Sequence, residues 1–221
     1  MSQCLYCHER KGKRPCPALQ GNICSPCCGA HRVVSINCPQ DCVYLDANVE
    51  YQQKRMGERF HHERKGLYRE LLEFGGEKAA EVFYLMEAVV YKHFHLNRNG
   101  QDGEVIAAIQ ALRRSLSPIY VPEVAPPAFA EALKKEYTAF MEGQKIDPGL
   151  VGEVLDRGLR FINQFSGDGL RSNQFLSGLI GFFTTRHPQV ANELTQLASS
   201  GGRIILPGTR PGQEDKPFLT P

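Results

Sequence analysis

All eight cysteines of this 221-residue chain fall between residues 4 and 42, and the residues beyond contain none. Cysteines at this density form either disulfide bonds or a metal site, and the redox compartment decides between the two. The polar N-terminal sequence has no apolar stretch of the kind found in secretory signals. We therefore expect a reducing, cytoplasmic setting and a metal site. Disulfides are the alternative if the protein is exported by an unconventional route.

The spacing of the cysteines divides them into two groups of four. A pair separated by two residues presents two thiolates to one ion from a tight turn, which is half of a tetrahedral zinc site. We expect the first site to consist of Cys4, Cys7, Cys24 and Cys27. The second site would consist of the remaining cysteines, Cys16, Cys28, Cys38 and Cys42. His31 follows Cys28 at ligand spacing and is an alternate ligand.

Cys27 and Cys28 are neighbours in the sequence, and neighbouring side chains point in different directions. One can therefore face the first ion while the other faces the second, so that a single dipeptide holds the two sites in a fixed relation. Residues 1–44 have too few apolar residues to build a core of their own. Two structural Zn²⁺ ions would supply the missing folding free energy, about 10 kcal/mol or more each.

The number of sulfur ligands argues against catalysis at these sites. Catalytic zinc keeps one position open for water and usually has three protein ligands, whereas eight sulfurs fill two sites. A redox role for the cysteine pairs would call for a thioredoxin-like strand and helix around them, which the sequence does not indicate. We expect no catalytic residues and no enzyme activity.

The motifs "CLYC", "CSPC" and "CPQDC", within residues 4–42, resemble the cross-brace and treble-clef zinc fingers. This broad group includes the RING, MYND and HIT fingers. The resemblance implies a module that zinc stabilises and that serves in molecular interactions. For residues 45–221 the sequence indicates no family.

Basic residues in and near the cysteine-rich segment raise a second possibility. The candidates for nucleic-acid contact are Arg10, Lys11, Lys13, Arg14 and Arg32. They are the only Lys or Arg residues of the segment 1–44, which also holds two acidic residues. Eight thiolates with two Zn²⁺ ions would bring its net charge close to zero. Because nucleic-acid affinity comes largely from phosphate neutralisation, binding would require the basic side chains to lie on one face.

The rest of the chain has the apolar spacing of helices. Residues 45–75 are highly charged and predict one long connecting helix, with Asp46 as its N-cap, a first half exposed to solvent, and an end at Gly75–Gly76. Residues 76–198 predict an all-α domain, with Asp102 and Asp147 as N-caps. Gly178 and Gly181 would allow two helices to approach closely. Residues 199–221 are rich in Gly and Pro and predict a flexible tail.

The expected fold is thus a small zinc-stabilised, cysteine-rich finger followed by an all-α helical domain. A non-enzymatic adaptor that binds another protein is the leading functional interpretation, and a nucleic-acid-associated regulatory protein is the alternative. No apolar run approaches the roughly 18 residues of a membrane span, so we expect no membrane partner. Glu58 and His61 match half of a di-iron motif, but the sequence has no second copy of it, which favours a solvated helix face.

Overall fold

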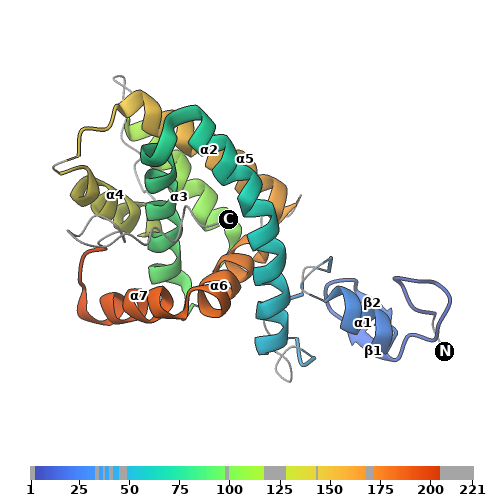
Figure 1. The fold of residues 1–221 in the computed structure, drawn as a ribbon. Coiled ribbons are helices and arrows are strands. Elements are labelled where there is room, and N and C mark those ends of the chain that lie inside the picture. Colours follow the sequence, from blue (N-terminus) through green and yellow to red (C-terminus); the bar gives the residue numbers. More distant parts are fainter. Residues whose placement is uncertain are drawn as a thin grey trace.

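The computed structural model describes residues 3–32, 35–36, 38–39, 42–44, 49–97, 100–116, 128–142, 144–167 and 172–204. A small finger within residues 3–44 lies at one side of a larger helical domain (Figure 1). The helices of that domain are α2 (Val49–Phe94), α3 (Asp102–Ser115), α4 (Ala128–Met141), α5 (Pro148–Ser166), α6 (Gln174–Arg186) and α7 (Pro188–Ser200). The prediction of a mostly helical chain with a cysteine-rich segment near its N-terminus is confirmed.

The finger contains a β-hairpin and one short helix. Strands β1 (Arg14–Cys16) and β2 (Gly21–Ile23) pair antiparallel, with Cys16 opposite Gly21. Helix α1 (Ser25–His31) follows directly, and it carries the neighbours Cys27 and Cys28. The buried residues in the described part of the finger are six of its cysteines together with Ile23 and Ile36. Such a small apolar cluster leaves most of the stability of the finger to the cysteines.

Helix α2 is a helical hairpin rather than one straight rod. Its backbone leaves the helical conformation at Gly76, where φ is 64° and ψ is −157°. Arg64 and Glu87 lie at nearly equal distances in sequence on either side of this turn, and they form two hydrogen bonds of 2.7 Å each across the hairpin. The Tyr68 hydroxyl donates to the same carboxylate at 2.6 Å. The helix end predicted at Gly75–Gly76 is confirmed, whereas the Asp46 cap lies outside the described residues.

The first half of α2 is part of the helical core. Met56 and Phe60 are fully buried, and Arg64 is 4% exposed. The Phe60 ring packs at centroid distances of 5.5–5.8 Å against rings from α5 and α6, namely Phe161, Phe165, Phe175 and Phe182. The expectation of a solvent-exposed first half is therefore wrong, because Met56 and Phe60 both lie in the core of the helical domain.

Two of the helix starts show how local and tertiary capping differ. The Asp147 side chain caps α5 as predicted, by accepting a hydrogen bond from the Leu150 amide at 3.1 Å. Asp102 does not cap its own helix, whose N-cap is Gln101. Its buried carboxylate instead accepts hydrogen bonds of 3.0 Å from the amides of Phe175 and Leu176 at the start of α6. The prediction that Asp102 caps its own helix is wrong. The N-terminus of α6 has no side-chain cap of its own, and the Asp102 carboxylate accepts hydrogen bonds there instead.

The chain after α7 returns to the helical domain. The last helix continues to Ser200, two residues past its expected end, and the Gly202 carbonyl then accepts a hydrogen bond from Lys92 Nζ at 2.6 Å. The Ile204 amide donates to Glu136 at 3.3 Å. Residues 201–204 are thus fixed against α2 and α4, while the rest of the predicted tail lies outside the described residues.

Helices α2 and α6 approach each other so closely that their backbones touch at glycines. A Cβ atom added to Gly57 would lie 2.5 Å from the carbonyl carbon of Gly181. A Cβ added to Gly181 would overlap the carbonyl oxygen of Gln53. The expectation of close helix packing at Gly181 is confirmed, and Gly57 is its partner.

We expect Gly181→Ala to lower the free energy of unfolding by about 1–3 kcal/mol, because the added methyl group must push two backbones apart. Gly66→Ala is the matched control. Gly66 lies in α2 with open space around its Cβ position, so that this change should raise stability by about 0.5–1 kcal/mol through helix propensity alone. Chemical denaturation of both variants measures the difference, and equal effects would contradict the close contact.

Candidate metal centre

The first two cysteines lie in a tight turn near the N-terminus. The His8 amide donates to the Cys4 carbonyl at 2.9 Å, and the Cys4 amide donates to the Arg10 carbonyl at 2.7 Å. His8 has a φ of 57°, a left-handed conformation in which histidine is one of the better-tolerated residues after glycine. The turn brings the Cys4 and Cys7 side chains to the same side, as the pair spacing predicts.

The second pair is set by the start of α1. Cys24 is the N-cap of this helix, and its sulfur accepts a hydrogen bond from the Cys27 amide at 3.5 Å. The Cys24 amide in turn donates to the sulfur of Cys4 at 3.2 Å, which ties the two pairs together. Amide groups directed at sulfur stabilise the thiolate form that a metal ion requires.

The sulfurs of Cys4, Cys7, Cys24 and Cys27 all lie within 4.8 Å of one another. A tetrahedral ion with bonds of about 2.3 Å to sulfur would place its ligands about 3.8 Å apart, so the cluster fits an ion after a small contraction. Cys4, Cys24 and Cys27 are buried, and none of the four is in a disulfide. Four sulfurs in this arrangement suit zinc or iron.

The protonation of these thiols reflects their crowding. Burial opposes ionisation of Cys4, but the amides of Cys24, Cys7 and Tyr6 outweigh it and lower its pKa to about 6. The amides of Glu9 and Arg10 lower the pKa of Cys7. The neighbouring sulfur of Cys24 and burial together raise the pKa of Cys27 to about 12. Full ionisation of the group therefore requires a bound cation.

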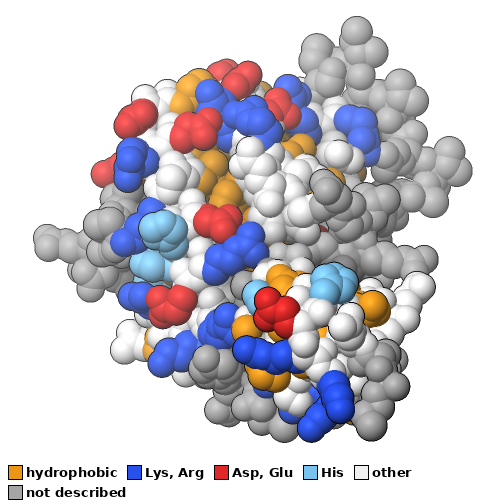
Figure 2. Space-filling model, turned by 90° about the vertical axis from the view of Figure 1, so that its right-hand side faces the viewer, with side chains coloured by type: hydrophobic (Ala, Val, Ile, Leu, Met, Phe, Trp, Pro, Cys, Tyr) orange, Lys and Arg blue, Asp and Glu red, His pale blue; other side chains and the backbone are white. Residues whose placement is uncertain are grey.

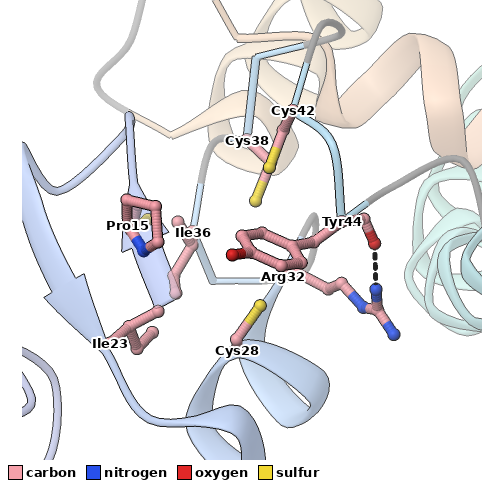
Figure 3. Close-up of a pocket in the computed structure, with 9 residues that line it drawn as sticks. Pro15, Ile23, Cys28, Arg32, Ile36, Cys38, Cys42 and Tyr44 are labelled. Atoms are coloured by element: carbon pink, nitrogen blue, oxygen red, sulfur yellow. Dashed lines mark hydrogen bonds between the residues drawn. The ribbon is translucent and has the colours of Figure 1, made fainter. Parts of the chain in front are cut away.

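The other four cysteines share a second location in the finger. Cys16, Cys28, Cys38 and Cys42 all line one cavity of about 10 Å³. Figure 3 shows the side chains of Cys38 and Cys42 directed into this pocket from one side, while Cys28 projects toward it from α1. Within the described part of the chain, only the first group brings three or more His, Cys, Asp or Glu ligand atoms together as a possible metal site. The predicted second group thus surrounds one pocket less tightly than the first.

Tyr44, which sequence reasoning did not single out, organises two of the candidate basic residues. Its ring lies between Cys28 and the Cys38–Cys42 pair in the view of Figure 3. The Arg14 guanidinium lies 4.9 Å from the centre of this ring, and the Tyr44 carbonyl accepts a hydrogen bond from Arg32. The signal in the sequence was an aromatic residue two positions after the last cysteine.

His31 belongs to neither group of cysteines. Its ring stacks on that of Tyr6 with 4.1 Å between centroids, and Nδ1 lies 3.1 Å from the Tyr6 hydroxyl. The remaining basic candidates, Arg10, Lys11 and Lys13, are exposed on the loop beside the first cysteine pair.

The Glu58–His61 pair of α2 is occupied by contacts within the helical domain. Glu58 forms an ion pair of 2.7 Å with Arg186, and the His61 ring stacks on Phe182.

Comparisons with known protein families, curated proteins and solved structures found no match for this chain. None of the helices in the described ranges has the length and apolar character needed to cross a membrane. The cysteine cluster itself is therefore the strongest indication of what the chain does.

Metal removal should unfold the finger and spare the helical domain, because only the latter has an extensive apolar core. Metal binding to such modules contributes on the order of 10 kcal/mol to folding. After treatment with a chelator we expect hydrogen exchange to lose protection in residues 14–31. The helices α2–α7 should keep both their protection and their circular dichroism signal. Unchanged protection in the finger would contradict metal-dependent folding.

Proposed function

We propose that this protein is a zinc-binding, non-enzymatic adaptor. The finger is a structural module that holds two Zn²⁺ ions, and the helical domain binds another protein. The observation that carries the proposal is the group of four cysteine sulfurs within 4.8 Å of one another. Four sulfurs occupy every position of a tetrahedral ion and leave none for water or substrate, which is the pattern of structural zinc.

Both the size and the lining of the second pocket support a second ion. A cavity of about 10 Å³ has room for about one water-sized sphere. Three of its four cysteines, Cys16, Cys28 and Cys38, are buried, and all four are free of disulfides. Because Cys27 belongs to the first group and Cys28 to the second, two residues of α1 would hold the ions in a fixed relation.

Metal analysis of the intact protein tests this arrangement. Protein purified without added metal should contain two Zn²⁺ per chain, and Cys24→Ser and Cys28→Ser should each leave one. His31→Ala is the matched control and should keep both, since the His31 ring faces Tyr6. Iron in place of zinc, one ion in the wild-type chain, or intact disulfides without metal would each overturn the two-zinc proposal.

A groove on the helical domain supports a protein as the partner. It has a volume of about 850 Å³ and lies between α4 and α7, over the end of α2. Pockets for small molecules are mostly apolar, whereas both acidic and basic side chains line this groove. They include Glu131, Lys135 and the ion pair of Lys92 with Glu136 at 2.6 Å. Mixed charge of this kind suits a polypeptide segment better than a nucleic acid, whose phosphates would meet the carboxylates.

Capture from the protein's own cell extract tests the adaptor role. The tagged chain should retain another protein after nuclease treatment, and the double change Glu131→Lys/Lys135→Glu should abolish retention without altering net charge. The control exchanges an exposed ion pair outside the groove, as Glu58→Arg/Arg186→Glu. A partner lost equally from both variants, or no retained protein at all, would contradict binding in the groove.

A further inference from the structure

One face of the finger carries an aromatic stack that the metal sites do not use. Tyr6 lies between the cysteines of the first pair, and its ring is stacked on His31 with an angle of 25° between the planes. The Tyr6 side chain is nevertheless 37% exposed, and its neighbour Leu5 is 46% exposed. The turn of the cysteine pair and the stack together fix the Tyr6 ring, so that little conformational entropy remains to be lost when a flat ligand binds it.

Exposed basic residues lie in the loop that follows this turn. Lys11 pairs with Gln3 in an isolated bridge, and the Arg10 carbonyl accepts the Cys4 amide at 2.7 Å. The Lys13 amide donates to the Ile23 carbonyl at 3.1 Å, which fixes the other end of the loop. Among the residues that the structure describes, no ion pair involves Arg10, Lys11 or Lys13. Their positive charge faces solvent.

The structure also separates the charges that nearly cancel in the sequence. Three of the four sulfurs of the first group belong to buried side chains, with Cys4 at 0%, Cys24 at 3% and Cys27 at 8% exposure, and Cys7 is half-buried. The lysines and arginines of the loop lie outside them. Hydrophobic, histidine and basic side chains, with an acidic side chain among them, lie next to one another in the lower part of the face shown in Figure 2, on the side from which the finger projects. A ligand at this surface would meet an aromatic ring and a loop whose three exposed cations outnumber its one exposed carboxylate, Glu9.

We propose that the finger binds single-stranded nucleic acid, with a base stacked on Tyr6 and phosphates contacted by Arg10, Lys11 and Lys13. An aromatic platform beside basic side chains is the combination that single-stranded RNA and DNA require, because every base has a flat face and every linkage a negative charge. Exposed lysines are depleted in the centres of protein interfaces, which favours nucleic acid over protein at this face. The proposal rests on the proposed function in one respect: the finger must be folded by its metal.

Binding of fluorescein-labelled oligo(U) and oligo(dT), followed by anisotropy with the zinc-loaded full-length chain, tests this proposal. Tyr6→Leu keeps an apolar side chain in the turn and should weaken binding roughly 5- to 150-fold, the range of one lost base stack. Tyr6→Phe keeps the ring and should retain most of the affinity. The two probes differ in the 2′-hydroxyl, and they therefore separate RNA from DNA as the preferred strand.

The basic loop has its own readout and a matched control. Lys11→Ala/Lys13→Ala should reduce the slope of log K against log salt by about 1.4, because each lost phosphate contact on a single strand contributes about 0.7. Lys78→Ala/Lys145→Ala removes the same charge from exposed positions of the helical domain outside the groove and should leave the slope unchanged.

Zinc content, measured on every sample, separates this proposal from the preceding one. Zinc-loaded protein that binds neither oligonucleotide at low salt overturns nucleic-acid binding and leaves the metal module standing. Equal losses in the two lysine variants would show charge attraction without a site and would also overturn it. A protein partner whose binding requires Tyr6, in a sample that binds no oligonucleotide, would overturn nucleic-acid binding as well. A chain without metal contradicts the proposed function itself.

Discussion

The finger depends on one electrostatic constraint: four sulfurs within 4.8 Å of one another cannot all carry a negative charge unless a cation lies between them. Amide groups favour the thiolates of Cys4 and Cys7, while neighbouring sulfurs oppose ionisation of Cys27. The backbone of the finger, with its tight turn, its short hairpin and the start of α1, is arranged around these sulfurs. With Ile23 and Ile36 as the apolar members of its buried cluster, the finger has little else to hold it together.

The helical domain is stabilised in a different way. Its core is rich in phenylalanine, and its two most polar buried features, the Arg64–Glu87–Tyr68 group and the Asp102 carboxylate, are fully hydrogen-bonded to partners in the same domain. The finger meets this domain at Arg55 of α2, which donates to the carbonyls of Gly29 and Ala30 at the end of α1. A small module whose four clustered cysteines suit a metal ion is thus attached to a domain with an extensive apolar core.

What the sequence could predict was local. Cysteine spacing placed Cys4, Cys7, Cys24 and Cys27 together, and an Asp-Pro pair placed the start of α5, because both depend on residues a few positions apart. Tertiary partners were not predictable in this way. Asp102 has the pattern of an N-cap, but it caps a helix more than 70 residues away. Arg14 and Arg32 have the appearance of free cations, yet both contact Tyr44, and nothing in their spacing indicates it.

The contact between Gly57 and Gly181 limits how this chain can vary. Each position excludes a side chain because the other backbone occupies the space, so neither can become larger while the helices keep their separation. A substitution at one would have to be matched by a shift of the whole of α6 against α2, and that shift would disturb the contacts of Phe60 with Phe175 and Phe182 of α6. Although Gly57 and Gly181 are more than 120 positions apart in the sequence, the two positions are therefore constrained together. A relative with this packing should carry a small residue at both.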